Sequence, residues 1–91
     1  MRQIKFYKPA LRFLKAVPPK HGRQILAKLD ELARAEDPPP DAKHLTGLPF
    51  WRAKAGNYRI VYDFAPETLW VVDIGKRNDD EIYRQVRRIV G

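Results

Sequence analysis

The sequence predicts a small α+β domain whose elements follow the order strand, helix, helix, strand, strand, strand, helix. Apolar residues recur at helical spacing between residues 9 and 35, alternate with polar residues from 51 onward, and return to helical spacing after residue 78. We therefore expect a helical hairpin packed on a mainly antiparallel four-stranded sheet, with a further helix near the C-terminus. Since the chain has 91 residues, we expect one domain over residues 1–91.

The first half of the chain is expected to form one strand and the helical hairpin. Polar and apolar residues alternate over residues 3–7, as in a strand. Pro9 suits the first turn of a helix, where its missing N–H costs nothing, and Pro18–Pro19 ends that helix. The second helix has an apolar face formed by Ile25, Leu29 and Leu32. Three consecutive prolines at 38–40 indicate a loop after it.

Three strands joined by short turns are expected next. Residues 51–55 alternate between apolar and basic, and we expect Trp51 and Ala53 to face the helical hairpin. Gly56–Asn57 is typical of a hairpin turn, and residues 58–64 are rich in β-formers. After a second turn, the nearly continuous apolar run at 69–74 predicts a central strand that is covered on both sides.

The last helix has a cap, an apolar stripe and a basic end. Asn78 or Asp79 is expected to cap its N-terminus, with acidic residues in the first turn. The stripe that faces the core consists of Ile82, Val86 and Ile89. Two arginines at 87 and 88 lie in the last turn, where cations complement the helix dipole.

The charge of the chain favours an anionic partner. The formal net charge is +7, and residues 1–29 and 42–62 contain no acidic residue. Such an excess of positive charge is typical of proteins that bind nucleic acid or an acidic protein. The absence of cysteine excludes disulfides and thiolate metal sites, and two histidines make a zinc site implausible, so we expect no metal and no cofactor. With no apolar run of membrane-spanning length and no signal peptide, we expect a cytoplasmic protein.

Basic residues gather around the second predicted strand. Arg52 and Lys54 point to the same side of it, about 7 Å apart, because alternate residues share a face. Arg59, just past the hairpin turn, can reach this face from the neighbouring strand, and Lys76 and Arg77 stand where the last strand ends. This cluster favours a bound anion and fits the phosphates of a nucleic acid. The alternative is an ordinary solvated strand face.

Three further residues have two interpretations each. Tyr83, next to the apolar stripe of the last helix, is either a residue at the edge of the core or part of a site. His44 follows the proline loop and is either a loop residue or a substrate contact. His21, in the connection between the two helices, is expected to be structural or exposed to solvent.

Five short motifs follow one another between residues 43 and 83. They are KHLTGLP at 43–49, WRAK at 51–54, GNYRIVY at 56–62, IGKR at 74–77 and EIY at 81–83. In this order, and together with the helical hairpin, the chain resembles the RelE/ParE toxin superfamily. The resemblance implies the small RelE-like fold, with the order β-α-α-β-β-β-α predicted above.

For the RelE branch, the resemblance implies an endoribonuclease toxin that cleaves messenger RNA in the ribosomal A site. The ribose 2′-hydroxyl attacks the adjacent phosphate and leaves a 2′,3′-cyclic phosphate and a 5′-hydroxyl. The residues that match the catalytic positions of the family are Arg52, Lys54, Arg59, Arg77 and Tyr83, and we expect Lys43, His44 and Lys76 to contact RNA.

The implied roles follow from the chemistry of each side chain. RelE has lysine where this chain has Arg52, and an arginine is a poor general base but a good phosphate clamp. Arg59 suits the same role, while Lys54 could accept the 2′-proton because neighbouring cations favour its neutral form. Arg77 is expected near the leaving 5′-oxygen, and Tyr83 is expected to orient the nucleophile or stack on a base.

Two alternatives share the fold. One is a ParE-type toxin that inhibits DNA gyrase, and the other is a non-catalytic member of the same superfamily. All three interpretations imply an acidic, partly disordered antitoxin as partner, encoded by an adjacent gene. We expect messenger RNA on the ribosome as the target, no membrane contact, and operator DNA only through the complex with the antitoxin.

Overall fold

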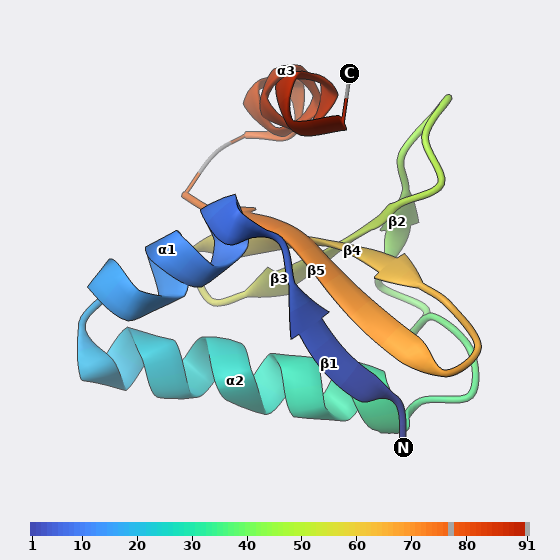
Figure 1. Ribbon diagram of the computed structural model, residues 1–91, viewed down its shortest axis with the longest axis horizontal. Coiled ribbons are helices and arrows are strands. Elements are labelled where there is room, and N and C mark those ends of the chain that lie inside the picture. Colours follow the sequence, from blue (N-terminus) through green and yellow to red (C-terminus); the bar gives the residue numbers. More distant parts are fainter. Residues whose placement is uncertain (77, 91) are drawn as a thin grey trace.

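The computed structural model describes residues 1–76 and 78–90 (Figure 1). The elements are β1 (Gln3–Phe6), α1 (Lys8–Ala16), α2 (Pro19–Arg34), β2 (Lys43–His44), β3 (Trp51–Ala55), β4 (Tyr58–Phe64), β5 (Thr68–Gly75) and α3 (Asp79–Val90). The predicted α+β class and element order are confirmed, with one addition. Strand β2 lies where a loop was expected, because these two residues pair with the outer edge of β3 and make a fifth strand.

The sheet places β5 in its interior. Its order is β1-β5-β4-β3-β2, in which β1 runs parallel to β5 and the other neighbours are antiparallel. The predicted three-strand meander and the buried position of β5 are therefore correct. Helices α1 and α2 cover one face of the sheet, and α3 lies on the other side (Figure 1). None of the helices in the described ranges is long and apolar enough to cross a membrane.

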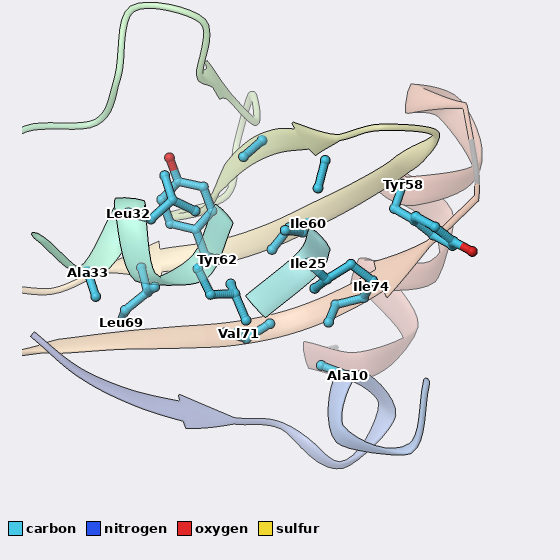
Figure 2. Packing of buried hydrophobic residues seen from close by; sticks show 13 residues of the cluster. Ala10, Ile25, Leu32, Ala33, Tyr58, Ile60, Tyr62, Leu69, Val71 and Ile74 are labelled. Atoms are coloured by element: carbon cyan, nitrogen blue, oxygen red, sulfur yellow. The ribbon is translucent and has the colours of Figure 1, made fainter. Parts of the chain in front are cut away.

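The larger core lies between the helical hairpin and the sheet (Figure 2). The predicted apolar face of α2 is completely buried there, and Trp51 and Ala53 point toward the hairpin as expected. Tyr62 of β4 is also completely buried, and no residue in the described part of the chain makes a hydrogen bond to its hydroxyl. Burial, together with the nearby negative charge of Asp41, raises the pKa of Tyr62 to about 12.

A smaller core joins α3 to the opposite face of the sheet. Its buried members are Leu45, Phe50, Val61, Val72, Ile82 and Val86. The predicted stripe of α3 thus packs on β4, β5 and the segment before β3. The cap of α3 is Asn78, whose Oδ1 accepts a hydrogen bond from the backbone N–H of Glu81 at 2.9 Å. This bond satisfies one of the amides that a helix leaves unpaired in its first turn.

A β-bulge interrupts the alternation of side chains along β5. Val61 pairs with Asp73, whereas the next residue of β4, Tyr62, pairs with Val71, so Val72 is an extra residue on β5. Val71 and Ile74 consequently belong to the core under the helical hairpin, and Val72 belongs to the core under α3. Because Asp73 pairs with Val61, its side chain shares the α3 face of the sheet.

Candidate nucleic-acid interface

Four basic residues of β2, β3 and β4 share the α3 face of the sheet. In the register, Lys43 pairs with Arg52, and Lys54 pairs with Arg59. Directly paired residues lie on the same face, as do alternate residues of one strand. The face opposite to the Trp51 and Ala53 side chains therefore carries Lys43, Arg52, Lys54 and Arg59, which we call the basic sheet face.

The members of the basic sheet face differ in their exposure. Arg52 is only 8% exposed, Arg59 is half-buried, and Lys54 is exposed. Arg52 and Arg59 both interact with other groups of the protein. The arginines are thus held close to the sheet, whereas the Lys54 ammonium can meet a ligand from solvent. This arrangement offers two guanidinium groups held by the protein and one exposed ammonium to an incoming anion.

Asp73 is a charged residue on this face that no sequence pattern had singled out. It is 4% exposed, and it occupies the same cross-strand row as Val61 and Arg52. Within an apolar run, strict alternation would have pointed Asp73 toward the helical hairpin. The bulge at Val72 reverses that direction, and a single sequence carries no clear signal for a bulge of this kind.

The end of β5 lies beside the basic sheet face. Arg59 pairs with Gly75, and the next residue, Lys76, is exposed. The Lys76 Nζ lies 5.4 Å from the centre of the Tyr58 ring. Arg77, which the sequence assigns to the catalytic set, lies outside the described residues. Because Tyr58 belongs to the core under the helical hairpin, the Lys76 ammonium lies on the hairpin side at this end of the sheet and not on the basic sheet face.

His21 has the structural role that was one of its two interpretations. Its Nδ1 is 2.6 Å from the Tyr58 hydroxyl oxygen, and the two rings meet edge to face. This contact joins the start of α2 to the start of β4.

Tyr83 is half-buried on α3, beside the smaller core. Its hydroxyl oxygen accepts a hydrogen bond from the backbone N–H of Thr46. The residue therefore ties α3 to the segment between β2 and β3. One interpretation of the sequence placed Tyr83 at the edge of the core, and the structure agrees with it. The Tyr83 hydroxyl nevertheless lies outside the apolar core, where it meets the backbone of Thr46.

His44 lies on the face of the sheet opposite to the basic sheet face. It pairs directly with Trp51, and the two ring centres are 4.9 Å apart. Trp51 packs against the core under the helical hairpin, so His44 shares that side, whereas its neighbour Lys43 shares the side of Arg52. The structure thus separates His44 from Lys43, its neighbour in the set of residues expected to contact RNA.

Concave and metal-binding features lie elsewhere or are not found. A surface depression of about 540 Å³ near the N-terminus is lined by Arg2, Arg34 and Glu67 among others, and it includes no member of the basic sheet face. Among the residues at 1–76 and 78–90, no group of three or more His, Asp or Glu side chains could hold a metal ion. The basic sheet face brings four cationic side chains together and is therefore the candidate site for an anionic ligand.

Solved structures with the same fold are toxins of toxin–antitoxin systems. A double mutant of the Escherichia coli toxin RelE in its free state aligns with a TM-score of 0.77 and 24% identity, covering 99% of this chain and 98% of that chain. The toxin in the intact E. coli RelBE complex gives 0.69 and 27%, covering 86% and 99%. The archaeal RelE–RelB complex from Pyrococcus horikoshii gives 0.69 and 24%, covering 86% and 97%.

The fold is therefore that of the RelE-type toxins. The family model described as the ParE toxin of the type II toxin–antitoxin system parDE matches residues 4–81, and the chain belongs to this family. A search of the curated proteins by sequence gives no match.

Proposed function

We propose that this toxin is an endoribonuclease that cleaves messenger RNA on the ribosome. The observation that carries the proposal is the basic sheet face, in which Arg52, Lys54 and Arg59 lie together on adjacent strands. The likeness to the toxin of the RelBE complex, at 27% identity over nearly all of that chain, supports the RelE branch. A partly buried cluster of two arginines and a lysine matches the needs of a reaction that builds negative charge on phosphate oxygens.

The proposed reaction forms a bond between the 2′-oxygen and phosphorus and breaks the bond between phosphorus and the 5′-oxygen. Arg52 and Arg59 bind the phosphate oxygens, because a guanidinium group can donate two parallel hydrogen bonds to a phosphate and stays protonated. Lys54 in its unprotonated form accepts the 2′-proton, and the 5′-oxygen, expected near Arg77, takes up a proton from water as it leaves as a hydroxyl. Tyr83 orients the nucleotide. Because Arg52 is nearly inaccessible to solvent, its charge needs little reorganisation during the reaction.

An acidic antitoxin is the second part of the proposal. The similar solved structures include RelE–RelB complexes, and the net charge of this chain is +7. We expect a partly disordered acidic chain to fold on this surface and neutralise the toxin. Operator DNA is then reached only through the complex. Mixing the purified toxin with the protein encoded by the adjacent gene, and measuring the complex by calorimetry, checks this partnership.

The decisive experiment is in vitro cleavage on ribosomes that are programmed with a defined message. New 5′-hydroxyl ends within the A-site codon are expected for the wild type. Arg59→Ala is expected to lower the single-turnover rate by about 100-fold, as when a transition-state donor is lost. Arg23→Gln is the matched control, because Arg23 is exposed on α2, away from the basic sheet face, and this variant keeps full activity.

Two results contradict this proposal. One is the absence of cleavage by the wild type on translating ribosomes. The other is unchanged growth inhibition by both Arg59→Ala and Tyr83→Phe, which would show that the assigned site does not carry the toxicity.

DNA gyrase is the second candidate target. The matching family model is that of ParE toxins, and this observation favours it. In a supercoiling assay with purified gyrase, a ParE-type toxin is expected to block supercoiling and to trap double-strand breaks. Lys54→Gln separates the two candidates, because it is expected to abolish RNA cleavage and to leave gyrase inhibition unchanged.

A further inference from the structure

A tryptophan lies between a lysine and an aspartate in one cross-strand row. Trp70 of β5 pairs with Lys5 of β1 on one side and with Asp63 of β4 on the other. Leu69 and Val71, the neighbours of Trp70 along β5, belong to the core under the helical hairpin, so Trp70 points to the opposite side of the sheet. Its two partners point the same way, because paired residues share a face. We call these three residues the Trp70 row.

The Trp70 ring is supported at one edge and partly open to solvent. Tyr7 meets it edge to face, with the ring centres 5.7 Å apart and the ring planes at 81°. Tyr7 is itself anchored, because its backbone N–H donates a 2.9 Å hydrogen bond to the Val71 carbonyl and its side chain packs against the smaller core. Trp70 is half-buried. A tryptophan held in this way offers a flat aromatic surface to a stacking ligand.

The two charged residues of the Trp70 row lie on opposite flanks of the ring. Lys5 is exposed, and its Nζ is 5.5 Å from the centre of the Trp70 ring. Asp63 is half-buried, and no hydrogen bond or ion pair occupies its carboxylate within residues 1–76 and 78–90. Since β1 and β4 are the two neighbours of β5, their backbones are about 10 Å apart. The row therefore presents an ammonium, a stacking ring and a hydrogen-bond acceptor in that order.

We propose that the Trp70 row binds one nucleotide of a single-stranded RNA and selects guanine as its base. The base stacks on Trp70, Lys5 moves from the ring to the adjacent phosphodiester, and the Asp63 carboxylate accepts hydrogen bonds from the edge of the base. Stacking on aromatic rings and hydrogen bonding at the base edge are the usual means by which proteins bind unpaired RNA bases. Guanine suits Asp63 because its N1–H and its 2-amino group are adjacent donors for the two carboxylate oxygens.

An RNA strand fits this row better than a free nucleotide does. The single ammonium of Lys5 matches the one charge of a phosphodiester, whereas a terminal phosphate carries about two charges at neutral pH. The net charge of +7 also attracts a polyanion more strongly than a small anion. This inference goes beyond the proposed cleavage reaction, because the row contains none of the residues assigned to it.

The first experiment reads the Trp70 ring directly. The ¹⁵N-labelled protein has two indole N–H groups, those of Trp51 and Trp70, and Trp70→Phe identifies the second signal by removing it. The probe is a pentanucleotide with 2′-O-methyl riboses and a central guanine between uridines, which has no free 2′-hydroxyl at the scissile positions. The Trp70 signal is expected to shift and the Trp51 signal to stay, because Trp51 packs against the core under the helical hairpin. A Trp70 signal that is unchanged at millimolar pentanucleotide overturns the proposal.

The second experiment measures the affinity for the same pentanucleotide. Trp70→Leu is expected to weaken binding about 10-fold, as the loss of one stacked base predicts, whereas Trp70→Phe keeps a ring and stays within about threefold of the wild type. Leu26→Ala is the matched control, because Leu26 is an exposed apolar residue of α2, on the other side of the sheet, and its loss leaves the affinity unchanged. Equal affinities of Trp70→Leu and the wild type overturn the proposal. If Trp70→Leu does not fold, the shift of the wild-type Trp70 signal decides.

The third experiment tests the two flanks of the ring. Lys5→Gln is expected to reduce the slope of log affinity against log salt by about 0.7, the value of one phosphate contact on a single strand. Replacing the central guanine by hypoxanthine, which lacks the 2-amino group, is expected to weaken binding to the wild type about fivefold and binding to Asp63→Asn less than about twofold. An unchanged salt slope contradicts the role of Lys5, and an equal preference in both proteins contradicts that of Asp63.

Guanosine monophosphate separates an RNA strand from a free nucleotide as the occupant. It is expected to bind at least about tenfold more weakly than the pentanucleotide, because it lacks the flanking phosphodiesters. Tighter binding of the mononucleotide overturns the assignment to RNA. Failure of the proposed ribonuclease function leaves these measurements intact, since the probe is bound and not cleaved.

Discussion

Replacing Lys54 by glutamine is expected to make the protein more stable and less active at the same time. Lys54 and Arg59 are directly opposite each other on β3 and β4, so two positive charges share one cross-strand pair. Like charges in this arrangement destabilise a sheet. Lys54→Gln removes one of the charges and keeps a side chain of similar length and polarity.

The size of the effect follows from the register. Directly opposite Cβ atoms are about 5 Å apart, and we place the charged ends about 7 Å apart because they diverge. Lys54 is exposed, so the dielectric constant is close to that of water, and Coulomb's law gives a repulsion of about 0.6 kcal/mol. For a domain of this size, that corresponds to a rise in Tm of roughly 2–5 °C. The cleavage rate is expected to fall by about 100-fold, because Lys54 is the proposed base.

Thermal and urea unfolding at low salt and in 1 M NaCl measure the change in stability caused by Lys54→Gln. The gain in stability is expected at low salt and is expected to shrink in 1 M NaCl, where the screening length falls to about 3 Å. Arg23→Gln controls for the change in net charge. A Lys54→Gln protein that is less stable than the wild type at low salt, or equally stabilised at both salt concentrations, would refute the repulsion. Full cleavage activity would refute the role of Lys54.

The remaining predictions concern Tyr62, Asn78 and Tyr83. Tyr62→Phe is expected to raise the free energy of unfolding by about 1 kcal/mol, because it removes a buried hydroxyl that has no hydrogen-bond partner in the described ranges. Burial raises the pKa of Tyr62 from 10.0 to about 12, so the stability of the wild type is expected to be complete below pH 10 and to fall by up to about 2–3 kcal/mol as the pH rises toward 12. Urea unfolding measured against pH should show no such fall for Tyr62→Phe. An equal fall in both proteins would contradict this assignment. Asn78→Ala is expected to cost about 1 kcal/mol in thermal unfolding through the lost cap of α3, whereas Asn78→Asp keeps most of the stability; equal losses would argue against the cap. Tyr83→Phe removes the acceptor of the Thr46 N–H, so hydrogen exchange at the Thr46 amide is expected to accelerate, and unchanged exchange would show that this bond is absent in solution.

Local patterns were sufficient to predict most of the fold. The change from helical to alternating periodicity placed the hairpin and the meander, and the alternation at Trp51 and Ala53 predicted which face of β3 meets the helices. Residue type limited the cap of α3 to Asn78 or Asp79, and in the structure Asn78 accepts the capping hydrogen bond. These features depend on neighbours in the sequence, which is why a single chain reveals them.

Features that depend on pairing between distant segments were not predictable. Strand β2 consists of two residues that gain their conformation from the edge of β3, and this pairing also puts His44 on the side of Trp51. The bulge at Val72 arises from the fit between β4 and β5, and it decides that Asp73 lies on the α3 face of the sheet. For the candidate site, the sequence therefore predicted that Arg52, Lys54 and Arg59 share a face, but not that a buried acid lies on that face.

The parallel pairing of β1 with β5 has a consequence for the timing of folding during synthesis. Strand β1 pairs with Thr68–Val71, which lies 65 residues further along the chain, so it must wait until that segment has been translated. Until then β1 has no partner strand, and the core under the helical hairpin lacks β5. Contacts over such long sequence separations make folding slow relative to local helix formation. A nascent chain of this topology therefore cannot complete its sheet before β5 leaves the ribosome.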